Sequence, residues 1–93
     1  MKWTVRVRPE AELDLLVAAG WHTAHRQGLG AEFLEELSAL IASLAENALL
    51  YAEIFDGVRR VFARRFPYAV TYQITDDEVV VLSVLRMRRR PAP

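Results

Sequence analysis

The sequence predicts an α+β protein with the element order β-α-α-β-β-β, in which a helical hairpin packs on one face of a small antiparallel sheet. Three observations indicate this fold: strict alternation in residues 2–8, helical spacing of apolar residues in 9–46, and extended apolar segments in 58–85. The chain has 93 residues, of which 53% are hydrophobic and 26% are charged. These values suit one core, so we expect residues 1–93 to form a single domain.

The N-terminal half is predicted to hold one strand and two helices. Residues 2–8 alternate between apolar and polar side chains, as a half-buried strand does. A helix is predicted for Pro9–Arg26, because proline suits the first helical turn and large apolar residues recur at helical spacing. The glycines of residues 27–30 indicate a turn, and a second apolar stripe predicts a helix over Ala31–Glu46.

The C-terminal half is predicted to hold a loop and three strands. Residues 48–57 are expected to form a loop whose large apolar side chains pack on the core. Strands are predicted for Val58–Arg65, Tyr68–Thr75 and Val79–Leu85. The last of these is apolar on both faces, which indicates a central strand. Residues 86–93 form a basic tail whose prolines argue against further sheet.

The charge of the chain is unevenly distributed, although its formal net charge is zero. Residues 1–57 contain four basic and nine acidic residues, whereas residues 58–93 contain eight arginines and three acidic residues. A basic face of this kind favours an anionic partner, either nucleic acid or an acidic protein. The alternative that the arginines form only a solvated rim stays open on composition alone.

Composition also restricts the chemistry and the location. The chain contains no cysteine, which excludes disulfides and thiolate metal sites. His22 and His25 are predicted to be surface residues without a third metal ligand, so no metal or cofactor is expected. No apolar run is long enough to cross a membrane, and no signal peptide is evident, so we expect a cytoplasmic protein without a membrane partner.

Arginines are the candidate site residues. Alternation along the strand 58–65 places Arg60 and Arg64 on one face and the apolar residues on the other. If the apolar face packs on the helices, both arginines lie on the open face of the sheet, where Arg86 and Arg88 of the tail can join them. Clustered guanidinium groups suit the binding of phosphate or of an acidic partner.

The order of several segments resembles the RelE/ParE superfamily of bacterial type II toxins. The resemblance covers nearly the whole chain, and its segments are residues 7–15, Trp21, 28–30, 33–34, 57–60, 65–72 and 76–85. It implies a helical hairpin on an antiparallel sheet. It also implies a small toxin that a cognate antitoxin wraps and neutralises, in a toxin–antitoxin hetero-oligomer.

The resemblance leaves three functions open. A ribosome-dependent mRNA endonuclease needs a proton acceptor, a proton donor and cations. This chain supplies only the cations: Ala69 stands where that branch commonly has arginine, and Arg86 where many relatives have histidine. A ParE-like toxin that binds DNA gyrase needs no acid–base pair, so we favour that branch. Enzymatic activity stays open but is disfavoured, because no general acid or base is evident, and an enzyme here would be an mRNA endonuclease. The third hypothesis is a non-toxic module that only binds an antitoxin.

Overall fold

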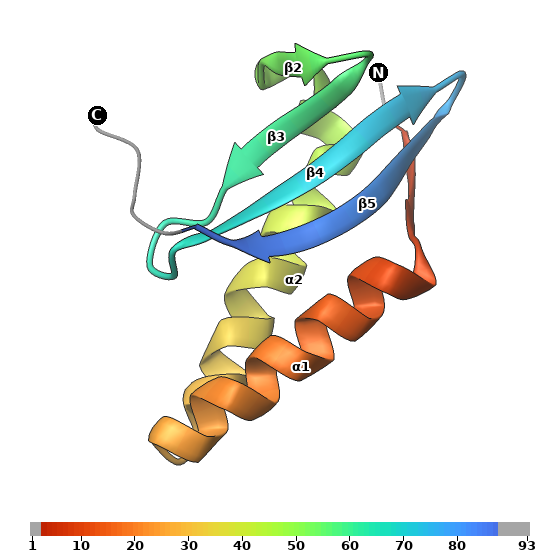
Figure 1. Ribbon diagram of the computed structural model, residues 1–93. Helices are drawn as coiled ribbons and strands as arrows, with labels where there is room; N and C mark the ends of the chain where they lie inside the picture. Colours follow the sequence, from red (N-terminus) through yellow and green to blue (C-terminus); the bar gives the residue numbers. More distant parts are fainter. Residues whose placement is uncertain (1–2, 88–93) are drawn as a thin grey trace.

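Two helices cover one face of a five-stranded sheet and leave the other face open (Figure 1). The computed structural model describes residues 3–87. The elements are β1 (Thr4–Val7), α1 (Pro9–His25), α2 (Leu29–Asn47), the 3-10 helix η1 (Ala48–Leu50), β2 (Glu53–Phe55), β3 (Val58–Phe62), β4 (Tyr68–Thr75) and β5 (Glu78–Arg86). The predicted α+β fold with a helical hairpin on one face of the sheet is confirmed. No helix within residues 3–87 is long and apolar enough to cross a membrane.

The sheet is mixed, with the strand order β1-β5-β4-β3-β2. Strands β2 to β5 pair antiparallel, as predicted, but β1 runs parallel to β5, with Thr4 opposite Glu78. Alternation in a sequence shows which face of a strand is buried, and does not show its direction. Parallel pairing needs a long connection, and here both helices and the strands β2 to β4 lie between β1 and β5. The segment 48–57, predicted to be a loop, contains η1 and the short edge strand β2.

The hydrophobic core lies between the helices and the sheet. Phe33, Leu37 and Leu44 of α2 are fully buried. Strands β4 and β5 meet them with the buried side chains Val70, Tyr72, Val79 and Val81. Alternation along residues 68–75 predicts that the even-numbered residues of β4 face the helices, and this is correct: Tyr68, Val70 and Tyr72 belong to the core, and Ile74 packs against it. Helix α1 contributes mainly small buried side chains, which are Ala11, Ala18 and Ala19.

A bulge in β5 changes which of its residues face the helices. Thr71 pairs with Ser83, but the next residue of β4, Tyr72, pairs with Val81. Leu82 is therefore an extra residue without a partner of its own. Before the bulge Val79 and Val81 face the core, and after it Val84 does so. Residue Arg86, two positions beyond Val84, consequently lies on the helix side of the sheet.

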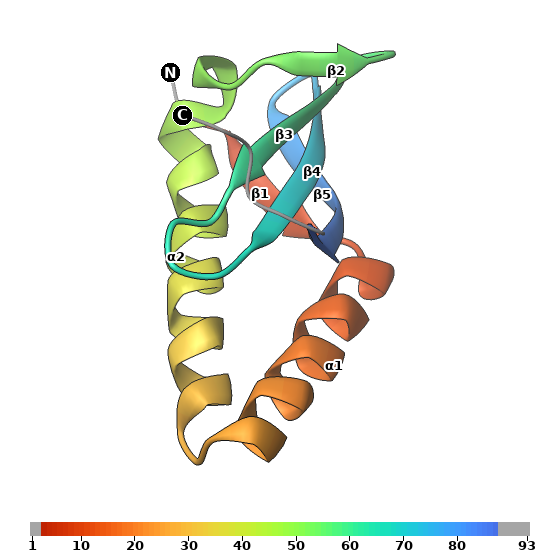
Figure 2. The ribbon, with the colours of Figure 1, turned by 60° about the vertical axis from the view of Figure 1, so that its left-hand side comes forward.

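The helices pack closely at the turn that joins them. Gly28 has a φ of +84°, a left-handed conformation that favours glycine. Gly30 packs so tightly on α1 that a Cβ atom there would collide with the carbonyl oxygen of Ala19 and the hydroxyl of Thr23. From this turn the helices diverge, and α1 stands away from α2 (Figure 2). Helix α1 therefore presents one side to solvent.

Candidate functional site

The predicted cluster of arginines on the open sheet face does not form. Arg60 lies on β3 on that face, with its guanidinium 5.0 Å from the ring centre of Phe62. Arg64 follows the end of β3 and lies beside α2 near Glu36, because the strand ends at Phe62 and its alternation does not continue. Arg86 faces the helices because of the bulge in β5. Arg88 lies outside the described residues, and the binding role of all four arginines stays a prediction.

The segment that carries Arg64 is held to α2 by two glutamates. The Glu36 carboxylate accepts hydrogen bonds from the backbone N–H groups of Arg64 and Arg65, at 2.7 and 2.9 Å. The side chain of Arg65 forms an ion pair with Glu32, which also pairs with Arg26. Hydrogen bonds from these two guanidiniums, Arg65 first, lower the pKa of Glu32 below its usual value. Arg65 therefore has an internal partner.

A hollow lined by described residues runs between α1 and the end of β5. This α1–β5 groove has a volume of about 550 Å³ and is lined by Leu13, Asp14, Val17, Ala18, Trp21, Tyr68, Val84 and Arg86. Strand β1 pairs with β5 only as far as Val81, so β5 continues beyond its neighbour. The Asp14 carboxylate accepts a hydrogen bond of 2.9 Å from the N–H of Val84 at this uncovered edge. The groove is therefore uncovered on the side where β5 extends beyond the end of β1.

Large apolar side chains of α1 are exposed along the groove. Leu13, Val17 and Trp21 recur every four residues and are between 47% and 64% exposed. These are residues of the apolar stripe that predicts the helix, yet α1 buries its alanines instead. Sequence reasoning therefore missed this surface. The available signal was that a second series of small residues, at 11, 18 and 19, also has helical spacing. A contiguous exposed apolar stripe of this kind is typical of interaction sites.

One cation lies at the end of the groove. The guanidinium of Arg86 is 4.9 Å from the ring centre of Trp21 and 5.9 Å from that of Tyr68. Such cation–π contacts hold the charge in position. Within residues 3–87, Arg86 forms no ion pair. The groove therefore combines an apolar wall with an available positive charge.

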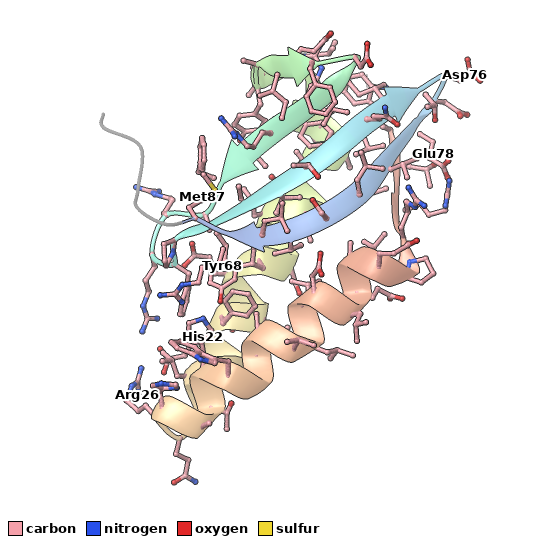
Figure 3. All side chains as sticks on the ribbon, in the orientation of Figure 1. His22, Arg26, Tyr68, Asp76, Glu78 and Met87 are labelled. Atoms are coloured by element: carbon pink, nitrogen blue, oxygen red, sulfur yellow. The ribbon has the colours of Figure 1, made fainter. Side chains whose placement is uncertain are left out.

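His22 is buried, contrary to the prediction that it is a surface residue, whereas His25 is exposed as predicted. The ring centre of His22 lies 5.0 to 5.6 Å from the ring centres of Phe33, Phe66 and Tyr68. Figure 3 shows His22 and Tyr68 close together between α1 and the sheet. The Nε2 atom of His22 has no hydrogen-bond partner in the described part of the chain. His22 continues the buried alanine series of α1, so the helical phase explains its position.

Burial of His22 predicts a pH-dependent stability. Burial, and then the charges of Arg86 and His25, lower the pKa of His22 below 6.5. The unfolded chain therefore binds a proton more readily, and the free energy of unfolding is expected to fall as pH decreases below 6.5. The fall stops below the pKa of the folded state. Every tenfold weakening of proton binding corresponds to about 1.4 kcal/mol. Urea unfolding between pH 7.5 and 5 measures this loss.

Two variants assign the effect to His22. His22→Leu is expected to remove this part of the pH dependence. His25→Leu is expected to retain most of it, because the charge of His25 is the smallest of the three causes that lower the pKa of His22. An unchanged pH profile in His22→Leu would contradict the assignment.

Tyr72, the fully buried tyrosine of β4, has a structural role. The Tyr72 hydroxyl donates a 2.7 Å hydrogen bond to the carbonyl oxygen of Ala48, and burial raises the pKa of Tyr72 to about 12. Tyr72 therefore joins β4 to η1 and is poorly suited to proton transfer at neutral pH. Within residues 3–87, no group of three histidine, cysteine, aspartate or glutamate residues is arranged to hold a metal ion.

Comparison with known proteins identifies the class of this fold. A family profile described as ParE toxin of type II toxin-antitoxin system, parDE, matches residues 5–91. The chain therefore belongs to the ParE toxin family, within the RelE/ParE superfamily. No curated protein sequence matches significantly.

Two solved structures share the fold. One is described as the chromosomal ParDE toxin–antitoxin system from P. aeruginosa, with a TM-score of 0.85, 15% identity, and coverage of 94% of this chain and 98% of that chain. The other is described as the toxin–antitoxin complex RelBE2 from Mycobacterium tuberculosis, with a TM-score of 0.68, 23% identity, and coverage of 94% and 100%. The predicted superfamily and its favoured ParE-like branch are confirmed.

Proposed function

We propose that this ParE-family toxin inhibits bacterial growth by binding a protein target in the cytoplasm, with DNA gyrase as the favoured target. The observation that carries the proposal is which side chains are buried and which are exposed. Tyr72 and His22, which could serve acid–base chemistry, are buried in structural positions, whereas large apolar side chains are exposed. Binding needs an apolar surface and no acid–base pair.

A cognate antitoxin is the second partner that we propose. Both similar solved structures are described as toxin–antitoxin systems, which supports such a partner here. The α1–β5 groove suits an acidic amphipathic segment of the antitoxin. Its apolar side chains would pack against Leu13, Val17 and Trp21, and a carboxylate would pair with Arg86.

The alternative functions are an mRNA endonuclease and a non-toxic antitoxin-binding module. In the endonuclease, Arg60, Arg64, Arg86 and Arg88 would hold phosphate. The different positions of Arg60, Arg64 and Arg86 around the sheet weigh against a phosphate site that all three share. The likeness to the RelBE2 complex supports the common fold and does not favour this alternative.

Pulse-labelling in bacteria tests the three functions. The chain is induced without an antitoxin, and the incorporation of labelled thymidine and labelled methionine is followed over the first minutes. An early fall in DNA synthesis is expected from the proposed binding to gyrase. An early fall in protein synthesis would instead favour the endonuclease, and continued growth with both rates unchanged would favour the non-toxic module.

A further inference from the structure

We propose that the open face of the sheet binds a protein segment that carries apolar side chains and one carboxylate. The site is a hollow of about 330 Å³ on the side of the sheet away from the helices. Its main side chains are those of Ile54, Phe55, Arg60, Leu82, Leu85 and Met87, and we refer to it as the sheet-face hollow. The inference rests on the proposed function, and it identifies the hollow as the contact surface for the toxin's target.

The hollow is apolar although no helix covers it. Phe55, Leu85 and Ile54 are 63%, 52% and 40% exposed. Beneath them, Val58 and Ala69 are buried without belonging to the core between sheet and helices. The bulge in β5 contributes to this surface, because it adds Leu82 to the open face. Exposed apolar side chains grouped over a buried apolar floor are typical of a protein-binding surface.

The polar groups of the hollow define the charge of the partner. The hydroxyls of Thr71 and Ser83 bond to each other at 2.5 Å, so each already has a partner. The Nε atom of Arg60 is buried, and no described residue accepts its hydrogen. None of the residues that line the hollow is acidic. A carboxylate from the partner would balance the positive charge of Arg60, because arginine pairs strongly with planar anions.

Other occupants fit the hollow less well. RNA needs several cations along its backbone, whereas Arg60 is the one described cation that lines the hollow. A second copy of this chain, related by a two-fold axis, would bring two Arg60 side chains to one interface without a carboxylate from either hollow. A different protein with an acidic residue among apolar ones satisfies both requirements.

The sheet-face hollow and the α1–β5 groove lie on opposite sides of the sheet. The hollow includes Arg60 and Leu85, and the groove includes Arg86, the next residue along β5, whose side chain points the other way. Substitutions in the hollow should therefore abolish the effect on the target without weakening the binding of the antitoxin to this chain. This separation allows the inference to be tested independently of the fold.

The test compares Leu85→Asp and Arg60→Gln with the parent chain. Growth arrest is measured by colony formation after induction, and binding is measured by calorimetry with the purified cognate antitoxin. Both variants are expected to lose growth arrest and to bind the antitoxin with a Kd within about threefold of the parent, since the groove is intact. Leu50→Asp is the matched control, because Leu50 is 74% exposed and lines neither surface. It should arrest growth as the parent does.

The outcomes separate failure of the inference from failure of the proposed function. Growth arrest by both hollow variants at the parental level would overturn the inference and leave the toxin function in place. Loss of antitoxin binding together with toxicity, in variants whose thermal unfolding is unchanged, would also overturn it. A parent chain that does not arrest growth would overturn the proposed function, and the assignment of the hollow to a target with it.

Discussion

Replacement of Trp21 with alanine is expected to weaken binding of the cognate antitoxin roughly 30- to 1,000-fold, as loss of a central aromatic anchor does. Trp21 forms one wall of the α1–β5 groove and is half exposed in the free chain. Its ring also holds the Arg86 guanidinium at 4.9 Å. The variant therefore removes apolar area and releases the charge that would pair with an antitoxin carboxylate. Calorimetric titration of the purified chain with the antitoxin measures the change.

Two further variants show whether the loss is specific. Trp21→Phe keeps an aromatic face beside Arg86 and is expected to restore most of the affinity. Leu50→Ala removes an exposed apolar side chain outside the groove and should leave the affinity unchanged. Equal affinities of Trp21→Ala and the parent would show that the antitoxin binds elsewhere. Thermal unfolding of each variant distinguishes lost contacts from a lost fold.

Replacement of Phe33 with alanine is expected to lower the free energy of unfolding by about 3–5 kcal/mol. Phe33 is fully buried, and its ring lies 4.8 to 5.3 Å from those of Tyr68, His22 and Phe66. The substitution leaves a cavity where α1, α2 and the sheet meet. Since small domains have only about 5–15 kcal/mol of stability, this loss would remove a large part of it.

Urea unfolding measures this loss against an exposed control. Leu16→Ala removes a side chain of similar apolar character that is 64% exposed, so a change below about 1 kcal/mol is expected. Comparable losses in the two variants would be inconsistent with a core centred on Phe33. The comparison tests the packing of the helices on the sheet without reference to any partner.

Local pattern was sufficient to predict both helices, the strands β1, β4 and β5, and the helix-facing side of β4. The alternation of Tyr68, Val70 and Tyr72 indicated their inward orientation, and all three are buried. The glycine turn at 27–30 indicated the hairpin, and Gly28 has the conformation that such a turn requires. These features depend on neighbours within a few residues, so a single sequence contains them.

Features that depend on distant residues were not predicted. The bulge at Leu82 arises from pairing with β4, and it reverses the side that Arg86 occupies. His22 is buried because aromatic rings from α2 and the sheet surround it. The exposure of Leu13 and Trp21 depends on the groove between α1 and β5, which nothing in the described part of the chain fills. Periodicity shows that a helix has two faces, and it does not show which face the rest of the protein covers.

The parallel pair of β1 and β5 has a consequence for the order of folding. Thr4 pairs with Glu78, so the first strand gains its neighbour only after the chain between them is in place. Closing so large a loop costs entropy before any contact repays it, and such long-range pairing slows folding. The hairpins β2–β3, β3–β4 and β4–β5 can form locally, with β1 joining last. Until then the edge of β5 that β1 covers would stay unpaired in a newly made chain, and an unpaired strand edge is open to pairing with other extended chains.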